Sequence, residues 1–396
     1  MKVAYLLPDP GIPVGGTKGA SVHVNAICRA LASSGADVTL YAARVTGSPP
    51  PGVRLVHIDP GPVPSGREGE VARMAAARRF YEQATASMKR DRPDVVHERL
   101  TLFGAGGADL AAEAGAGRLV EVNAPIAEER ARHFGLFHSE AAHEAERKAL
   151  HRAHVSAVSS PLARWAGERG AARAAVVPNG ADTSALSPGR WNREVEAIRL
   201  RMGLEGKTVV GFVGSLKPWH GVEVLLEALS IAPRSDVSVM IVGDGPRRWA
   251  LESMASEIPA TRTVFSGAVP QEQVPAFVAA TDISVAPYTP SDEFYFSPLK
   301  VAEAMAAGKA VVASDFEPVA ELMGDTGVRV PAGDARRLAE AVGLLADDPE
   351  LRQRLGGEAR TRAVRMLDWS QVAARTIDLY HQACSAVGGV GLETAV

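Results

Sequence analysis

Short apolar segments, each followed by a glycine-rich loop and a helical pattern, recur along the whole chain. The first example is an apolar strand over 3–7, a loop rich in proline and glycine over 8–19, a helix over 20–33 and a strand over 37–41. A strand, a loop, a helix and a second strand within about forty residues form the repeating unit of a parallel α/β sheet. The recurrence therefore restricts the chain to folds in which helices cover both faces of a parallel sheet.

The recurrence comes in two series with a break between them. Further strands of the first series are expected over 94–97, 118–122, 155–159 and 175–178. Strands of the second series are expected over 208–214, 237–242, 263–267 and 283–287. The pattern predicts an α/β protein with two Rossmann-like, doubly wound domains.

The position of the domain boundary follows from the break. A chain of 396 residues is too long for one hydrophobic core, so a boundary is required. A polar stretch around Pro188 interrupts the pattern, and we place the first domain over 1–185 and the linker with the second domain over 186–369. The last segment has helical spacing with no strand after it, which predicts a helix over 370–390 that packs back on the first domain.

Composition excludes several classes of protein. With 46% hydrophobic residues, 22% charged residues and a formal net charge of -3, the chain is typical of soluble globular proteins and has no basic surplus for nucleic acid. No apolar run approaches the roughly 18 residues that span a bilayer. Proline and glycine follow the first strand too soon for a signal peptide, so we expect a cytoplasmic protein without membrane association.

The sequence offers no clear metal or disulfide framework. Cys28 and Cys384 lie in helical patterns at opposite ends of the chain. His133, His138 and His143 recur every five residues, which would spread them around a solvated helix instead of placing them on one face as metal ligands. We therefore expect no bound metal ion, and the sequence leaves the oligomeric state open.

The segment that begins at Ser297 is the most informative single motif. Ser297 is suited to the N-cap of a helix and Pro298 to its first position. The N–H groups of Leu299 and Lys300 would then face outward at the positive end of the helix dipole, where phosphate binds. Glu303, one turn further on, can accept hydrogen bonds from sugar hydroxyls. The motif predicts a site for a nucleoside diphosphate; the alternative is an ordinary capped helix before a core strand.

Five motifs follow one another along the chain: Gly15–His23, Pro178–Asp182, Gly211–Lys217, Val242–Pro246 and Ser297–Asp315. In this order they resemble the retaining, nucleotide-sugar-dependent glycosyltransferases of family four, and the resemblance covers nearly the whole chain. It implies the GT-B architecture, in which two Rossmann-like domains face each other across a cleft. It also implies transfer of a sugar from a nucleotide diphosphate sugar to a hydroxyl of a small polar or natural-product acceptor, with retention at the anomeric carbon and no metal or other cofactor.

The resemblance assigns acceptor binding to the first domain and most of donor binding to the second. The donor-binding residues would be Gly16, Thr17, Gly214, Ser215, His220, Gly243, Asp244, Gly245, Ser297, Leu299 and Glu303. The catalytic residues would be Lys217, Lys300, Asn123 and Glu293. The acceptor-binding residues would be Lys18, His23, Glu98 and Arg99. Glycines in such loops let the backbone approach a ligand that a Cβ would obstruct, and the lysines would neutralise the leaving diphosphate.

The chain departs from the family pattern where the diphosphate would bind. Ser215 and His220 occupy places that hold an arginine and a lysine in most relatives. Two explanations stay open. Lys217 and Lys300 supply the charge, or stabilisation of the leaving group depends on pH through His220.

Two further departures concern recognition of the sugar. Family members carry two glutamates eight residues apart, but the residue eight positions before Glu303 is Tyr295, so Glu293 is the nearest candidate for the missing carboxylate. Many relatives place a histidine after the strand over 118–122, where this chain has Asn123, which can hydrogen-bond a hydroxyl but cannot act as a base at neutral pH.

The same architecture admits two other functions. One is a nucleotide-sugar epimerase, and the other is a non-catalytic relative that binds nucleotide sugars. Among acceptors, a small soluble molecule, a lipid-linked sugar and a growing polysaccharide are all open, and we favour the first because no membrane-binding feature is convincing.

Overall fold

The computed structural model describes residues 1–63, 66–258, 260–291 and 294–390. Glu293, the candidate for the missing carboxylate, lies outside these residues. The chain divides into two compact units. One contains Met1–Pro178 together with helix α15 (Trp369–Val390), and the other contains Asn179–Asp368.

The first unit is built on a parallel sheet of seven strands in the order β3-β2-β1-β4-β5-β6-β7. The strands are β1 (Lys2–Leu7), β2 (Asp37–Ala42), β3 (Val53–His57), β4 (Val95–Arg99), β5 (Gly117–Val122), β6 (His154–Ala157) and β7 (Arg173–Val176). Its other helices are α1 (Gly19–Ser33), α2 (Gly66–Asp91), α3 (Gly107–Ala114), α4 (Ile126–Phe134), α5 (Ser139–Leu150) and α6 (Ser160–Glu168). Strand order reverses at β1, which pairs with both β2 and β4, and ligands of such sheets bind at the carboxyl ends of strands around this point.

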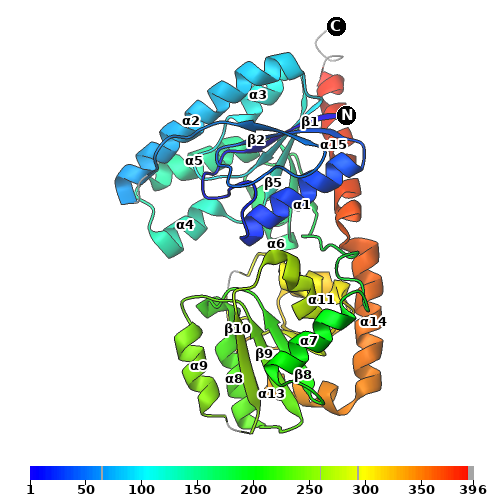
Figure 1. Ribbon diagram of the computed structural model, residues 1–396. Helices are drawn as coiled ribbons and strands as arrows, with labels where there is room; N and C mark the ends of the chain where they lie inside the picture. Colours follow the sequence, from blue (N-terminus) through cyan, green and yellow to red (C-terminus); the bar gives the residue numbers. More distant parts are fainter. Residues whose placement is uncertain (64–65, 259, 292–293, 391–396) are drawn as a thin grey trace. The chain divides into compact units, whose positions relative to one another are not determined.

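The second unit repeats the design with a parallel sheet of six strands in the order β10-β9-β8-β11-β12-β13. The strands are β8 (Thr208–Val213), β9 (Val237–Val242), β10 (Arg262–Gly267), β11 (Ile283–Ala286), β12 (Ala310–Ser314) and β13 (Val328–Val330). The α-helices are α7 (Asn192–Met202), α8 (Val222–Ile231), α9 (Arg248–Ser256), α10 (Val274–Ala279), α11 (Leu299–Ala306), α12 (Glu317–Met323), α13 (Ala335–Asp347) and α14 (Pro349–Met366). Short 3-10 turns cover Pro218–His220 and Gln271–Gln273. Figure 1 shows each sheet with its flanking helices, so the predicted pair of Rossmann-like domains is confirmed.

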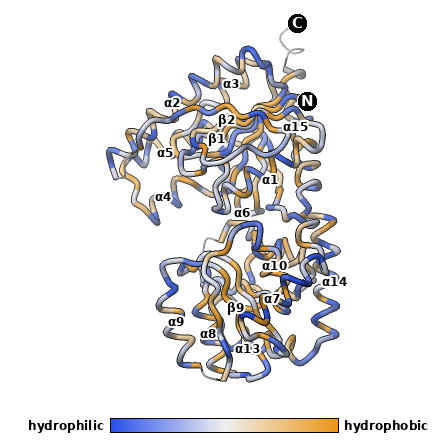
Figure 2. Tube along the Cα trace, viewed as in Figure 1, coloured by the Kyte–Doolittle hydropathy of each residue, from blue (hydrophilic) through white to orange (hydrophobic). Residues whose placement is uncertain are grey.

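The apolar pattern of the sequence explains these layers. Strand β9 is buried along its whole length, as expected for a strand covered on both faces. Helix α13 buries Leu338, Val342 and Leu345, which recur at helical spacing, and it packs on α8. Figure 2 shows hydrophobic residues along the strands of each unit and more hydrophilic residues on the helices.

The division between the units lies at Pro178, whereas the sequence suggested residue 185. Residues 179–185 belong to the second unit because they pair with the end of α14. The N–H of Ala181 donates to the carbonyl oxygen of Leu367 at 2.7 Å, and the hydroxyl of Thr183 hydrogen-bonds the carboxylate of Asp368. Helix α15 packs on β5 and α1 of the first unit, as the predicted helix over 370–390 requires.

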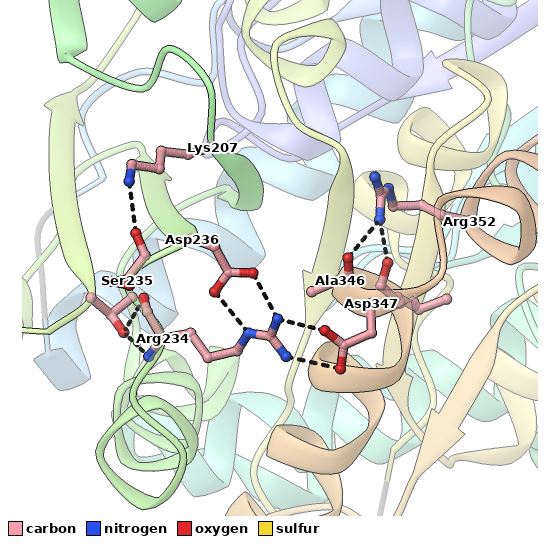
Figure 3. A network of polar contacts seen from close by, with 9 residues as sticks. Lys207, Arg234, Ser235, Asp236, Ala346, Asp347 and Arg352 are labelled. Atoms are coloured by element: carbon pink, nitrogen blue, oxygen red, sulfur yellow. Dashed lines mark hydrogen bonds and ion pairs between the residues drawn. The ribbon is translucent and has the colours of Figure 1, made fainter.

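Two consecutive acidic residues at the junction of α13 and α14, Asp347 and Asp348, have structural roles. Arg234, before β9, bonds the carboxylates of Asp236 and Asp347 with its Nη2 atom at 2.7 and 2.6 Å, and Figure 3 shows this network. The side chain of Asp348 accepts a hydrogen bond from the N–H of Leu351 at 2.8 Å and so caps the helix. Asp347 therefore links α13 to Arg234 before β9, and Asp348 starts α14.

The described residues contain neither a membrane-spanning helix nor a cluster of metal ligands. None of the helices there is both long and apolar enough to cross a bilayer. Nor do these residues bring together three histidine, cysteine or acidic side chains that could hold a metal ion. The run of histidines does not lie on one helix, because α4 ends at Phe134, before Gly135 with a φ of 76°, and His138 precedes α5.

Candidate functional site

Helix α11 begins one residue later than the sequence predicted. Pro298 occupies the N-cap position and provides no side-chain hydrogen bond. The expected cap, Ser297, instead accepts a hydrogen bond at Oγ from the N–H of Asn179 at 3.1 Å, and its carbonyl accepts one from Asn179 Nδ2 at 2.8 Å. Ser297 therefore anchors the Pro178–Asp182 motif to the start of α11. Leu299 and Lys300 lie in the first turn, where backbone donors have no intrahelical acceptor.

The ammonium group of Lys300 is buried and makes no hydrogen bond to any described residue. Its Nζ lies 4.2 Å from the ring centroid of Phe212 and 5.1 Å from that of Tyr288. A Cβ at Gly214 would lie 3.2 Å from Nζ, so the absence of a side chain there makes room for the lysine. Burial lowers the pKa of Lys300 to about 7, although Glu303 opposes the shift. A buried cation without an acceptor is suited to an anionic ligand.

Glu303 lies one turn further along α11 and is half-buried. Burial raises the pKa of its carboxyl to about 7, and the nearby Lys300 opposes this shift. Near neutral pH the carboxyl can therefore both accept and donate hydrogen bonds, as an interaction with ribose hydroxyls would require. Its contact with a ribose stays a prediction.

Two glycine-rich loops at the carboxyl ends of β8 and β9 interlock. The N–H of Leu216 donates to the carbonyl oxygen of Asp244 at 2.9 Å. A Cβ at Gly243, whose φ is 130°, would overlap the carbonyl oxygen of Gly214, and one at Gly245 would lie 2.6 Å from the carbonyl oxygen of Leu216. These glycines are thus needed for the loops to pack on each other, a reason that differs from the close approach of a ligand expected from the sequence.

Asp244, expected at the donor, is engaged within its own loop. Its Oδ1 accepts a hydrogen bond from the N–H of Gly245 at 2.7 Å, and Oδ2 lies 3.3 Å from Arg248 Nη1. These contacts shape the loop and neutralise its carboxylate.

His220 is held in one tautomer. Its Nδ1 lies 2.5 Å from the carbonyl oxygen of Ser215, which can only accept, so Nδ1 carries a proton. Burial, together with the charges of Lys300 and Lys217, lowers the pKa of His220 to about 4. In the free protein His220 is therefore neutral at pH 7 and supplies none of the positive charge expected of it. Lys217 is exposed, with its Nζ 4.8 Å from the ring centroid of Trp219.

An aromatic cluster fixes the loop that precedes α11. The rings of Phe294 and Phe316 stack at 4.1 Å, and Tyr288 lies 5.0 Å from Phe294 and 5.5 Å from Phe296. Tyr288 thus joins this cluster to Lys300. Sequence reasoning did not include Tyr288 or Phe212 among the site residues, because aromatic residues beside strand ends usually belong to the core.

In the first unit, the buried carboxylate of Glu121 gathers polar side chains at the carboxyl ends of β1, β4 and β5. Its Oε2 accepts a hydrogen bond from the hydroxyl of Tyr5 at 2.9 Å and lies 3.4 Å from His97 Nε2. Its Oε1 lies 3.1 Å from His23 Nε2 and also contacts Arg99 Nη1. Burial alone would raise the pKa of Glu121, but His23 and Arg99 hold it well below its usual range.

This cluster, which we call the Glu121 hub, contains three of the predicted residues. Asn123 Nδ2 donates to Glu121 Oε1 at 2.5 Å, so His23, Arg99 and Asn123 share one carboxylate. Sequence reasoning missed Glu121 itself. The available signal was an acidic residue within the apolar strand β5, where a charge requires partners.

Helix α15 contributes to the same hub. The hydroxyl of Tyr380 lies 2.7 Å from His97 Nδ1, and the rings of Trp369 and His23 form a T-shaped pair with centroids 5.5 Å apart. The return of α15 to the first unit thus orients both histidines.

Glu98 does not join the hub, although it was expected at the acceptor. It is 1% exposed and accepts hydrogen bonds from the hydroxyl of Tyr81 at 2.5 Å and from the N–H of Gly107 at 3.3 Å. Because successive side chains of a strand point to opposite faces, Glu98 and Arg99 cannot both face the hub. Glu98 instead fastens α2 and α3 to β4.

The loop before α1 contains the other predicted residues of this unit. Thr17 and Lys18 are exposed, and Lys18 stands at the N-cap of α1 without a side-chain cap. A Cβ at Gly16 would come within 2.7 Å of Ser21 Oγ, so this glycine is needed for the loop to fold against α1.

Comparisons with known proteins agree with this architecture. Residues 17–185 match the family described as Glycosyltransferase Family 4, and residues 207–348 match Glycosyl transferases group 1. The chain is 33% identical over 246 residues to the phosphatidyl-myo-inositol mannosyltransferase of Mycolicibacterium smegmatis, a match that covers 61% of this chain and 59% of that protein. The chain thus spans about three-fifths of the length of this relative.

Two further similarities extend over nearly the whole chain. The D-inositol 3-phosphate glycosyltransferase of Streptomyces avermitilis is 30% identical over 417 residues, which covers 96% of this chain and 86% of that protein. The crystal structure of Anabaena HepE in complex with UDP superposes with a TM-score of 0.71 at 18% identity, covering 96% of this chain and 100% of HepE. The second similarity concerns the fold alone.

Proposed function

The chain belongs to the family 4 glycosyltransferases of GT-B fold, and on this premise we propose that it transfers a sugar from a nucleoside diphosphate sugar to a hydroxyl group of a small polar acceptor, with retention at the anomeric carbon. The second unit would hold the donor and the first unit the acceptor.

The observation that carries this proposal is the buried ammonium of Lys300 at the start of α11. Its Nζ has no acceptor among the described residues, and two aromatic rings and Gly214 surround it. The first-turn N–H groups of Leu299 and Lys300 add the positive end of the helix dipole. A diphosphate would satisfy both sets of donors, and the proposal requires no metal ion.

The proposed reaction breaks the bond between the anomeric carbon of the sugar and the diphosphate oxygen, and the electron pair stays on that oxygen. The acceptor hydroxyl attacks from the same face and its proton passes to the leaving diphosphate, which gives retention without a protein nucleophile. The chain would contribute positioning and charge stabilisation, mainly through Lys300 and the exposed Lys217.

The Glu121 hub supports an acceptor rich in hydroxyl groups. Its carboxylate fixes Asn123 and His23, which can each hydrogen-bond a hydroxyl, and it balances the charge of Arg99. The names of two relatives refer to inositol-based acceptors, so a cyclitol or a similar polyol is the class to test first.

A thermal-shift screen of nucleoside diphosphates and nucleotide sugars tests the donor site, because a ligand of the folded state raises the melting temperature. Cyclitols and aminocyclitols are then added to the best donor in an assay for released nucleoside diphosphate. Release only in the presence of an acceptor supports transfer. Conversion of the nucleotide sugar alone would indicate an epimerase, and binding without turnover across the panel would indicate a binding protein.

A further inference from the structure

His220 has an unusual setting for a residue near a diphosphate. Its Nδ1 proton is committed to the carbonyl oxygen of Ser215 at 2.5 Å, and its ring centroid lies 6.0 Å from that of Tyr288 and 6.2 Å from that of Phe212. The same two rings flank the ammonium of Lys300. His220 and Lys300 therefore belong to one cluster at the carboxyl ends of β8 and β11.

Because Nδ1 is committed, Nε2 is the ring atom that can change its protonation. In the neutral ring Nε2 is an acceptor, and two acceptors, the ring nitrogen and a phosphate oxygen, cannot bond each other. A phosphate oxygen beside His220 would therefore favour a proton on Nε2, which turns this atom into a charged donor.

The charged groups around His220 favour the neutral ring until an anion arrives. Lys300 approaches from α11 and Lys217 from the same loop, and both lower the pKa of His220. Tyr288 faces it as a neutral phenol, since burial raises the pKa of that hydroxyl well above its usual value.

Two acidic side chains on neighbouring elements already have arginine partners, and Glu303, on α11, interacts with Lys300. Asp244, after β9, lies 3.3 Å from Arg248, and Glu223, on α8, lies 2.6 Å from Arg247. A bound diphosphate would therefore add negative charge beside Lys300 Nζ and His220, neither of which has a carboxylate hydrogen-bond partner among the described residues.

We propose that His220 takes up a proton when the nucleotide sugar binds and then donates a hydrogen bond from Nε2 to the diphosphate as a catalytic residue. This inference rests on the proposed function. The proton comes from solvent, stays on Nε2 while the anomeric carbon–oxygen bond breaks and charge grows on the diphosphate, and returns to solvent when the nucleotide leaves. His220 would thus provide a charge that is present only in the complex.

Calorimetric titration at pH 6 tests the proposal, with UDP-glucose or the nucleotide sugar selected by the thermal-shift screen. The diphosphate diester of such a ligand does not titrate near this pH. Measurements in two buffers of different ionisation enthalpy give the number of protons taken up. At pH 6 Lys300 is already largely protonated, whereas His220 is neutral in the free protein. We expect an uptake of roughly 0.5 to 1 proton per ligand, and an affinity that falls up to about tenfold per pH unit above pH 5.

Three variants separate this role from packing. H220N can keep the hydrogen bond to the Ser215 carbonyl but has no titrating atom. Proton uptake should therefore fall to about 0.2 proton per ligand or less, and kcat/KM should fall about 10- to 100-fold. H220K is charged before binding, so uptake should also disappear while kcat/KM stays within about tenfold of wild type. The matched control is H381Q, which removes an exposed histidine of α15.

The outcomes distinguish this inference from the proposed function. Transfer activity with no proton uptake by the wild type, or with equal uptake by wild type and H220N, would refute the role of His220 alone. Equal loss of activity in H220N and H220K would indicate packing. Failure of the wild type to bind any nucleotide sugar would refute both proposals.

Discussion

Replacing Lys300 by methionine should stabilise the ligand-free protein while weakening nucleotide binding. Methionine keeps much of the length of the lysine side chain and suits the rings of Phe212 and Tyr288, but it carries no charge. The two effects have opposite signs because Lys300 has no acceptor in the described protein and would gain one from the ligand.

The size of the stability effect follows from the pKa of Lys300, which burial lowers from 10.5 to about 7. At about 1.4 kcal/mol per pKa unit, the charged form costs the folded state at most roughly 5 kcal/mol. This cost is fully present below pH 7 and disappears as the pH rises toward 10.5, because in that interval the unfolded chain binds the proton and the folded chain does not. Local relaxation reduces the effect, so we expect K300M to raise the free energy of unfolding by about 1 to 3 kcal/mol at pH 7.

The affinity effect is the loss of a charge-assisted contact to the diphosphate. Such a contact contributes about 1.5 to 3 kcal/mol, so the dissociation constant of the nucleotide sugar should rise about 10- to 100-fold. Urea unfolding of the ligand-free protein measures the first effect and calorimetric titration measures the second.

Lys309 provides a matched control. It is also a largely buried lysine with a pKa lowered by burial, to about 8, but its Nζ donates to the carbonyl oxygen of Ala279 at 2.6 Å. K309M leaves that carbonyl unpaired and should destabilise the protein by about 1 to 3 kcal/mol without changing nucleotide affinity. Destabilisation of K300M comparable to that of K309M, or nucleotide binding by K300M at wild-type strength, would refute the reasoning.

Three further substitutions test other parts of the structure. G243A places a Cβ against the carbonyl oxygen of Gly214 at a φ of 130°, so urea unfolding should show a loss of about 1 to 3 kcal/mol, and titration should show weaker nucleotide binding. D348A removes the N-cap of α14, so the free energy of unfolding measured in urea should fall by about 1 kcal/mol while nucleotide affinity stays unchanged. E121Q leaves Arg99 with a neutral partner and should lower the free energy of unfolding by about 3 to 5 kcal/mol at pH 7. Because the pKa of Glu121 is held low in the folded state, its contribution is present above the unfolded value of about 4.3 and is lost as the pH falls below it, so urea midpoints of wild type and E121Q should converge in acid.

The strands that the sequence did not predict show where periodicity fails. β3 and β13 each form one edge of their sheet, and neither is buried along its whole length. Edge strands need less apolar surface than central ones. Val53–His57 contains Arg54 and His57, and Val328–Val330 has only three residues with Arg329 in the middle. Central strands such as β9 are apolar except at single positions such as Ser238, because helices cover both faces, and their sequences therefore predicted them.

The residues of the candidate site also differ in whether the sequence alone could predict them. Lys300 was predicted because a charged residue in the first turn of a capped helix has a local physical meaning. Glu121 was not, because its significance depends on partners from α1, β1 and β4 that the fold brings together. The neutral state of His220 also depends on tertiary structure, since it requires both burial and the approach of Lys300.

The two units differ in how they balance charge, and this difference indicates which ligand each one suits. In the first unit the carboxylate of Glu121 neutralises the charge of Arg99. The Glu121 hub therefore presents hydrogen-bonding groups such as Asn123 but little net charge. In the second unit the ammonium of Lys300 has no acceptor in the described protein. A buried cation is costly unless an anion joins it, whereas a neutralised cluster loses stability if a charged ligand disturbs its ion pairs. This difference in charge balance supports the proposal that the second unit holds the diphosphate of the donor and the first unit a polyol acceptor.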